Sequence, residues 1–298
     1  ANPVHSDDGC QSGTPTLMLV REILERAKTI PQAISIIKET KVMAAHSLLI
    51  ADGKSSAAVV VEASPRKLAL RRAKGRIGLT NHFLHPKHKS DAANDRHRRY
   101  TASGARYKRL KQLLARFGGR IDPGTAALIL RNRTALNDEP LAIGHRAALD
   151  SLITTHAVVI DLSELVIWIG RGPHLLGPFV AVDLKPLFGV AAKSADPPQE
   201  IEADPLVGTP DLERFLLARS QMKHARRLRD AGALLAAIGF ARRAIKGAQE
   251  LPEAYKLLGD LLWRRGEREL AKKRYRRFLE LRPPFKEEVE QVRGRLME

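Results

Sequence analysis

The first 190 residues alternate between helix-like and strand-like spacing of apolar side chains. Apolar residues that recur every three or four positions predict helices at residues 14–27, 31–40, 98–117 and 123–130. In the first of these helices the apolar stripe consists of Leu17, Val20, Leu24 and Ala27. Short β-branched or apolar runs bounded by turn residues predict strands at residues 47–51, 57–63, 67–72, 76–80, 154–161, 165–169 and 179–183. Consecutive hairpins with helices grouped between them favour antiparallel sheets covered by helices.

This alternation ends near residue 190. Residues 191–210 are rich in Pro, Ala and acidic side chains and show no apolar period, which predicts a linker. Beyond residue 210 the pattern is helical throughout. The sequence therefore predicts a first domain at 1–190, a linker at 191–210 and an all-α region at 211–298.

Within the helical region, residues 252–283 resemble a tetratricopeptide repeat. The residues that carry the pattern are Tyr255, Leu258, Gly259, Gly266, Ala271, Tyr275 and Pro283. A weaker copy lies 34 residues earlier, where Gly232 and Ala237 match but Gln221 and His224 replace the aromatic residue and the leucine. We expect two such repeats covered by a last helix at 285–296. They indicate either a docking surface for a peptide or protein partner, or a helical appendage that packs on the first domain.

Positive charge is concentrated in two parts of the chain. The net charge of +18 divides into −1 for residues 1–65, +16 for 66–133, −6 for 134–210 and +9 for 211–298. Basic regions of this size attract anionic partners, and a solvated basic surface is the alternative interpretation.

The chain has no convincing membrane segment. The best candidate, residues 152–170, is interrupted by Thr154, Thr155, His156, Asp161, Ser163 and Glu164. No leader-peptide pattern begins the sequence, which favours a soluble, cytoplasmic protein and leaves open an export signal already removed. Cys10 is the single cysteine, so internal disulfides are excluded.

The stretch LTNHF places Asn81 directly after the strand predicted at 76–80. An Asn at a strand end can aim its amide at a developing oxyanion, beside backbone N–H groups. Most such residues only satisfy a turn. Asn81 by itself therefore leaves both interpretations open.

Taken in order, several stretches resemble one family: GTPTLMLVREILERAKTIPQAISIIKE, HSLLIADG, AAVVVEASP, LTNHF, SGARYKRLKQLL and DEPLAIGHR. That family is the penicillin acyltransferase-like (acyl-CoA:6-aminopenicillanic acid acyltransferase, peptidase C45) branch of the N-terminal-nucleophile hydrolases. The similarity runs from about Gly9 to Phe188, and it depends on the order and spacing of the stretches rather than on one motif. It implies an α+β fold, a partial αββα sandwich with two stacked antiparallel sheets and helices outside.

The resemblance also implies acyl transfer or amide hydrolysis. In the family an internal cut frees a Cys at the start of the catalytic chain, and a thioester forms on it. The α-amine of that Cys serves as the base, which its pKa of about 7.7–8.0 permits at neutral pH.

Residues of this chain match positions in the family. Asn81 matches the Asn that binds the oxyanion, and Arg146 of DEPLAIGHR matches an Arg close to the nucleophile. Arg106 and His82 lie in shared segments and are expected to contact substrate. We expect Asn81 and Arg146 to share a pocket. The alternative for Arg146 is an ion pair with an acidic neighbour: Asp138, Glu139 or Asp150.

Cys10 does not fit the nucleophile. It lies three residues before Gly13, in the loop before the first helix, and nine preceding residues deprive it of a free α-amine. Ala1 carries only a methyl group. The resemblance therefore implies that the nucleophile lies upstream of this chain, which by itself is expected to be inactive. Cys10 is interpreted as an ordinary loop cysteine.

Four histidines, His82, His85, His88 and His97, are close together in the sequence. A proline inside the cluster, with no neighbouring Cys or spaced carboxylates, argues against zinc, so we expect no metal. These histidines are interpreted as loop residues at the mouth of a pocket. The basic stretch at 88–116 has Tyr100 and Tyr107 as its aromatic residues and matches no nucleic-acid module, so we expect no nucleic-acid partner. It is interpreted as an anion-binding rim, for instance for acyl-CoA phosphates, or as a solvated face.

Two functions remain open at this point. The first is an amide hydrolase or acyltransferase that takes a small acyl-amide or acyl-thioester substrate, with no bound cofactor and with acyl-CoA as a candidate substrate. The second is a non-enzymatic interaction protein in which the sandwich is degenerate and the helical repeats bind the partner.

Overall fold

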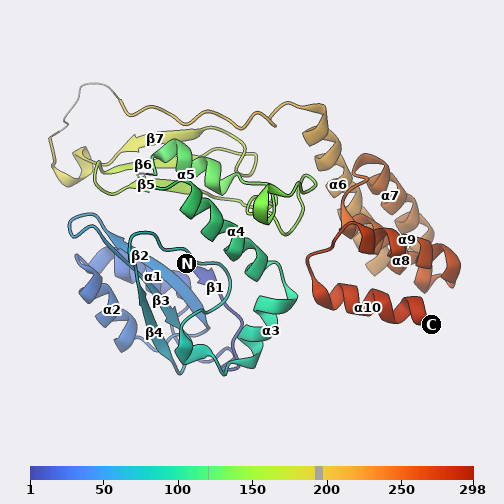
Figure 1. Cartoon of the computed structure of the whole chain (residues 1–298), viewed down its shortest axis with the longest axis horizontal. Helices are drawn as coiled ribbons and strands as arrows, with labels where there is room; N and C mark the ends of the chain where they lie inside the picture. Colours follow the sequence, from blue (N-terminus) through green and yellow to red (C-terminus); the bar gives the residue numbers. More distant parts are fainter. Residues whose placement is uncertain (120, 192–196) are drawn as a thin grey trace. The chain divides into compact units, whose positions relative to one another are not determined.

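The computed structural model describes residues 1–119, 121–191 and 197–298 (Figure 1). The chain forms two compact units, Ala1–Arg120 with Asp161–Val166, and Ile121–Ile160 with Ile167–Glu298. The expected division at 191–210 stays a prediction, and residues 192–196 of that segment lie outside the described part of the chain. Within the described ranges, no helix combines the length and the apolar character needed to cross a membrane.

The first unit is built on a four-stranded antiparallel sheet. Its strands follow one another in chain order: β1 (Asn2–Pro3), β2 (His46–Asp52), β3 (Ala57–Ala63) and β4 (Leu68–Arg72). Helices α1 (Thr16–Arg26) and α2 (Ile30–Glu39) pack on one face of this sheet. Leu48, Val59 and Val61 point into that interface and are almost completely buried. The hairpin and third strand predicted from the sequence are confirmed.

The apolar stripe expected on the first helix is wrong in two positions. Leu17 and Leu24 are each 78% exposed, whereas Leu19 and Ile23 are buried against the sheet. Residues four apart share one helix face, so burial of Leu19 and Ile23 turns Leu17 and Leu24 outward. The sequence offered two apolar stripes on this helix, and burial in the core shared with α2 and the sheet selects the other one.

Two further predictions about the first unit are wrong. Residues 76–80 form no strand, because Arg76 donates to the Leu114 carbonyl and Gly78 packs against Leu110, so this segment crosses a helix instead of pairing with β4. The single helix predicted at 98–117 is two helices, α3 (Ala92–Tyr100) and α4 (Ser103–Arg116). The break follows from Thr101, whose extended backbone ends α3 while its hydroxyl donates to the His97 carbonyl.

The opposite face of the sheet carries a buried acid. Glu62 on β3 is fully buried and lies opposite Ser47 of β2 and Ala69 of β4. Its carboxylate accepts from Arg71 Nε at 2.5 Å and from the backbone N–H groups of Leu84 and His85 at 3.0 and 2.9 Å. Glu62 thereby fastens the loop that follows β4 to the sheet.

The second unit contains a three-stranded sheet. Its order is β5 (Val158–Asp161), β6 (Val166–Gly170) and β7 (Phe179–Asp183), and α5 (Pro123–Leu130) precedes it in the chain. Short 3-10 turns lie at η1 (Pro86–His88) in the first unit and at η2 (Leu136–Asp138) and η3 (Pro186–Phe188) in the second. Two antiparallel sheets are therefore present, as the α+β prediction requires, and their face-to-face stacking stays a prediction.

A group of buried charges organises the second unit. Arg131 donates to the carbonyls of Leu175, Gly177 and Glu202, each at 2.8 Å. Arg133 pairs with Asp150 at 3.1 Å and with Asp204 at 2.8 Å. These bonds hold together four segments that are distant in the sequence, near residues 131, 150, 176 and 203. The last of them belongs to the expected linker, which is therefore bound to the rest of this unit in that part.

The C-terminal helices form antiparallel neighbours: α6 (Pro210–Asp230), α7 (Leu234–Gly247), α8 (Pro252–Arg264), α9 (Arg268–Glu280) and α10 (Lys286–Met297). Ala237 and Ala271 are fully buried, and a Cβ on Gly259 would lie 2.5 Å from the Tyr275 ring. Helices α8 and α9 therefore cross too closely for larger side chains. The helical region is confirmed, and its assignment to the tetratricopeptide class stays a prediction.

The first prediction concerns the buried acid. Glu62→Gln removes the charge that holds Arg71 and weakens the bonds to the loop, so we expect the free energy of unfolding to fall by about 3 kcal/mol. Urea denaturation of the full chain measures it. Glu25→Gln, which breaks an exposed ion pair with Arg21 on α1, should change stability by less than about 1 kcal/mol. Equal effects of the two substitutions would refute the anchoring role of Glu62.

The second prediction uses two glycines in C-terminal helices. Gly259→Ala should destabilise the protein by about 1–3 kcal/mol, because the added methyl group meets the Tyr275 ring. Gly294→Ala on α10 has open space around the new Cβ and should stabilise by about 0.5–1 kcal/mol through helix propensity. Thermal unfolding of both variants tests the close crossing, and a stabilising Gly259→Ala would contradict it.

Candidate functional site

Asn81 lies on the loop between β4 and α3 rather than at a strand end. Its backbone N–H donates to Ser103 Oγ at 2.9 Å, and Ser103 is the fully buried first residue of α4. Two residues farther along, the Phe83 N–H donates to the Asn94 carboxamide oxygen at 2.7 Å. With Glu62 binding the next two N–H groups, the loop is fixed by side chains from β3, α3 and α4.

The side chain of Asn81 is oriented by Arg106. Arg106 Nη2 on α4 donates to Asn81 Oδ1 at 2.9 Å, so the oxygen of the amide faces the guanidinium. The Asn81 Nδ2 donates to the Pro3 carbonyl of β1 over a longer 3.3 Å. The hydrogen-bond network thus assigns which end of the amide is nitrogen. The structure brings together Asn81 and Arg106, two of the residues singled out from the sequence.

His82 is adjacent and almost completely buried. Its Nδ1 lies 2.8 Å from Ser103 Oγ and 3.1 Å from Thr80 Oγ1, and the edge of the ring meets Tyr107. Burial, followed by the positive charge of Arg98, lowers the pKa of His82 to about 4. The imidazole is therefore neutral at pH 7 and acts on the position of the loop through Ser103. Its expected contact with substrate stays a prediction.

Sequence reasoning missed Ser103 and Glu62, the two residues that set this geometry. Ser103 bonds to Thr80, Asn81 and His82 at once. The signal for Glu62 was present, because it is an acid inside the apolar strand AAVVVEA. A carboxylate in a buried strand loses its contact with water, so it needs hydrogen-bond donors or a positive charge beside it. Nothing in the sequence singled out Ser103 from other helix-starting serines.

The remaining histidines have separate local roles. His85 Nδ1 caps the η1 turn by accepting from the Lys87 N–H, His88 stacks on Phe83, and His97 stacks on His5. Over residues 1–119, 121–191 and 197–298, no group of three His, Cys, Asp or Glu side chains has an arrangement that could hold a metal ion.

Arg146 lies in the second unit, where it lines a cavity of about 670 Å³ with Arg219 and Arg226 of α6 and Glu253 of α8. The acids considered as its partners are engaged elsewhere in two cases: Asp150 pairs with Arg133, and Glu139 pairs with Arg282. Burial raises the pKa of Glu253, and the charge of Arg146 opposes this shift. Asn81 and Arg146 belong to different units, so their common pocket stays a prediction.

Cys10 lies in the loop between β1 and α1 and its side chain is exposed and free. The following residue fixes this loop, since the Gln11 N–H donates to the Met43 carbonyl at 2.8 Å. The position of Cys10 matches the loop expected from the sequence.

The third prediction is a pH dependence of stability. The folded-state pKa of His82, about 4, lies below its ordinary 6.5, so the unfolded state binds more protons between these values and stability falls as pH falls from 6.5 to 4. His82→Asn keeps a hydrogen-bonding atom near Nδ1 but does not titrate there. Between pH 6.5 and pH 4 the free energy of unfolding of the wild type should therefore fall by about 3 kcal/mol more than that of His82→Asn.

Urea denaturation at a series of pH values measures the difference. His156→Asn, which replaces an exposed histidine, is the control and should follow the wild-type curve. If the curves of His82→Asn and wild type stay parallel from pH 6.5 to 4, the imidazole is not held neutral in the native state.

Comparison with known proteins adds to this geometry. Residues 1–169 match the family described as acyl-coenzyme A:6-aminopenicillanic acid acyl-transferase. The match contains Asn81, His82, Arg106 and Arg146. No curated protein matches the chain. Because the match spans more than half of the 298 residues, the chain belongs to the acyl-coenzyme A:6-aminopenicillanic acid acyl-transferase family.

Proposed function

We propose that this chain carries the oxyanion-binding part of an acyltransferase or amide hydrolase that acts on small acyl-amide or acyl-thioester substrates. Family membership supports the reaction class. The single observation that carries the proposal is the orientation of the Asn81 amide by Arg106. Attack on an acyl carbon places negative charge on the former carbonyl oxygen, and a fixed neutral donor stabilises that charge.

The amide of Asn81 has a donor to spare. A carboxamide nitrogen has two N–H groups, and within the described residues Nδ2 donates to one acceptor, the Pro3 carbonyl. Arg106 occupies the oxygen, which prevents the amide from rotating its nitrogen away. The nearby guanidinium charge also favours an anion at this place. These features suit a preorganised oxyanion donor.

The attacking group is part of the proposal. We assign it to a Cys upstream of Ala1, freed by internal cleavage, whose own α-amine takes the thiol proton. The thiolate attacks the acyl carbon, the leaving amine or thiol departs with the proton, and the thioester then passes its acyl group to water or to an acceptor amine. Residues 1–298 alone are expected to be inactive, and Cys10 takes no part.

Other parts of the chain have supporting roles in the proposal. Arg146 contacts a carboxylate or oxygen of the substrate, His82 and Arg106 line the substrate site, and acyl-CoA is a candidate acyl donor with no further cofactor. The C-terminal helices, as two tetratricopeptide-like repeats with a capping helix, provide a docking surface for a peptide or protein. A non-enzymatic protein that uses only these helices is the competing function.

The fourth prediction tests the oxyanion role. In the protein produced from its full coding sequence, Asn81→Ala should lower kcat for acyl transfer from an acyl-CoA to 6-aminopenicillanic acid, or for hydrolysis of the product amide, by about 10²–10³-fold. KM should change little, because the charge develops in the transition state. Release of thiol or amine measures the rate.

Two controls complete the test. Gln249→Ala removes an exposed amide from the loop before α8 and should leave kcat unchanged. Intact mass should show cleavage before the upstream Cys, and thiol alkylation should abolish turnover. Unchanged kcat in Asn81→Ala removes the oxyanion role, whereas absence of both cleavage and turnover in the full protein favours the non-enzymatic function.

A further inference from the structure

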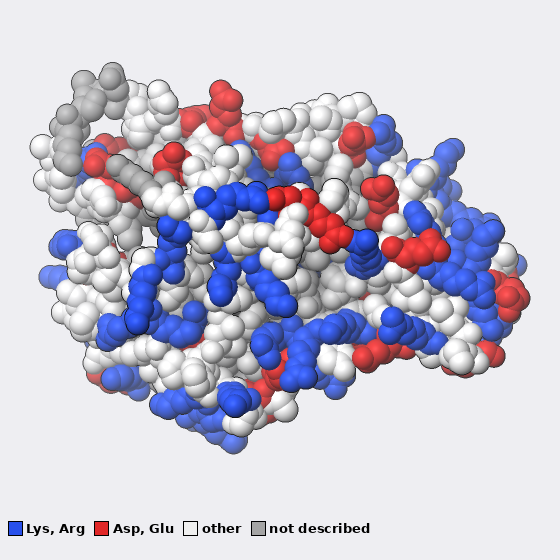
Figure 2. Space-filling view, viewed as in Figure 1, with Lys and Arg blue, Asp and Glu red and all other residues white. Residues whose placement is uncertain are grey.

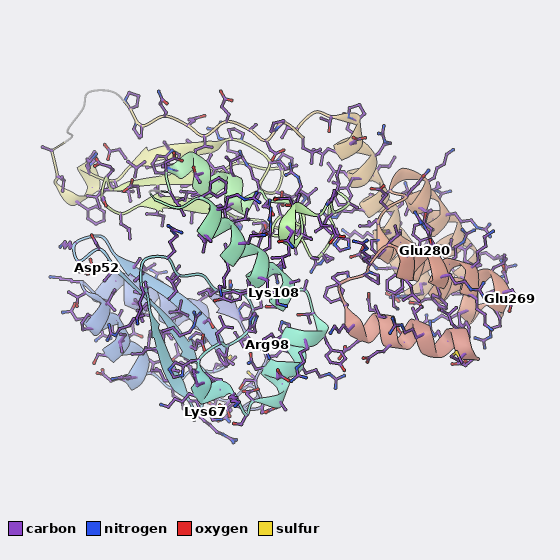
Figure 3. All side chains as sticks on the ribbon, viewed as in Figure 1. Asp52, Lys67, Arg98, Lys108, Glu269 and Glu280 are labelled. Carbon is purple, nitrogen blue, oxygen red and sulfur yellow. The ribbon has the colours of Figure 1, made fainter. Side chains whose placement is uncertain are left out.

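A second cavity, of about 410 Å³, lies in the first unit. The loop at 83–89 and helix α3 line it, and its lining includes none of Asn81, His82, Ser103 or Arg106. Figure 2 shows Lys and Arg side chains gathered around the position that α3 occupies in Figure 1, and Arg98 on this helix is labelled in Figure 3. The cavity thus opens in a strongly positive part of the chain.

Arg98 and Arg99 share one acid at this cavity. Arg98 Nη2 lies 2.7 Å from Asp95 Oδ1, and Arg99 Nη2 lies 2.5 Å from Asp95 Oδ2. Hydrogen bonds from both arginines lower the pKa of Asp95, so the acid is ionised and the trio has a net charge of about +1 at neutral pH. A guanidinium has five N–H donors, so each keeps donors beyond its bond to Asp95. Lys89, also in the lining, adds a further cation.

Two imidazole rings line the same cavity. His85 Nδ1 accepts from the Lys87 N–H at 3.1 Å, so in the neutral ring the proton is on Nε2, which is a donor. His88 is 2% exposed and stacks on Phe83 with ring centroids 4.0 Å apart. Burial lowers the pKa of His88, and the charge of Glu62 and a hydrogen bond with its backbone oppose this shift, so His88 packs the wall of the cavity beside Glu62.

We propose that this cavity binds a phosphate ester, with the phosphate held by Arg98, Arg99 and the imidazole of His85. Hydrogen-bond donors outnumber acceptors in the lining of the cavity, which favours an anionic ligand. A phosphate ester has three terminal oxygens that can accept from these donors, whereas a carboxylate has two. The space exceeds that of a phosphate alone, and Phe83, Leu84 and Pro86 supply apolar lining for the organic part of the ester. This inference does not depend on the proposed acyl transfer.

Isothermal titration of the full chain with adenosine 3′,5′-bisphosphate tests the proposal. We expect saturable binding, with inorganic phosphate binding more weakly at the same site because it lacks the organic part. Equal affinity for the two would overturn the assignment to an ester, and absence of binding by both would overturn the site. Asn81→Ala should bind with wild-type affinity, so a failure of the catalytic proposal is distinguishable from a failure of this one.

Matched variants locate the site. Loss of a charged hydrogen bond weakens binding about tenfold, so Arg98→Ala/Arg99→Ala should bind the bisphosphate about a hundredfold more weakly. Arg21→Ala/Arg26→Ala is the control, since it removes two exposed helix arginines that also pair with acids one turn away. It should change affinity less than twofold. Similar losses in both double variants would show general charge attraction instead of a site.

His85 provides a further readout. His85→Phe retains an aromatic ring in the lining of the cavity but removes both ring nitrogens, and it should weaken binding about fivefold to tenfold. In the wild type the ring signals of His85 should shift in NMR spectra when the bisphosphate is added. Unshifted ring signals with unchanged affinity in His85→Phe would exclude the imidazole from the site.

Discussion

The buried carboxylate of Glu62 is the interaction on which the candidate site depends. A fully buried acid is tolerated only where charged and polar donors replace water, and Glu62 obtains them from Arg71 and from two successive backbone N–H groups. Those N–H groups belong to the loop that carries Asn81 and His82. The sheet therefore positions the candidate donor through a side chain of β3, while Ser103 fixes the same loop from α4. Loss of the acid would free the loop from the sheet and leave the Asn81 amide poorly oriented.

The second unit uses the same principle with the opposite sign of charge. Arg131 is buried and satisfies its guanidinium with three backbone carbonyls, and Arg133 joins two acids that are far apart in the sequence. Irregular segments lack the regular backbone hydrogen bonds of a helix or a sheet, so their carbonyls need other donors. A guanidinium has five N–H donors and can therefore bond to carbonyls of several segments at once. In each unit, buried charge orders loops that also contribute side chains to the hydrophobic clusters, Phe83 in the first unit and Leu152 and Leu176 in the second. Substitutions at these charges are for this reason expected to disturb local loop order more than overall secondary structure.

The sequence predicted the elements of the fold better than the contacts of the site. Short apolar or β-branched runs bounded by turn residues placed β2, β3 and β7 correctly, because such residues suit a buried strand. It failed on residues 76–80, where β-like composition is overridden by packing on α4, and on Leu17 and Leu24, where two apolar stripes competed. Asn81 was singled out through its motif, and its role stays a prediction. The role of Ser103 and the orienting bond from Arg106 could not be predicted from the sequence. Both are side-chain hydrogen bonds between residues more than twenty positions apart.

The positive charge of the first unit connects these observations to chemistry. Residues 66–133 carry a net charge of +16, and nearby cations add to burial in keeping His82 neutral. A neutral imidazole cannot supply charge to an oxyanion, so stabilisation would come from a fixed amide and from guanidinium groups that stay ionised at any working pH. Arg106 fulfils both needs at once, because the bond that orients Asn81 also places a permanent positive charge beside it. Under the proposed function, such an arrangement would make oxyanion stabilisation insensitive to the protonation of the neighbouring histidine, and the thiol and α-amine of the proposed nucleophile would set the pH dependence of the reaction.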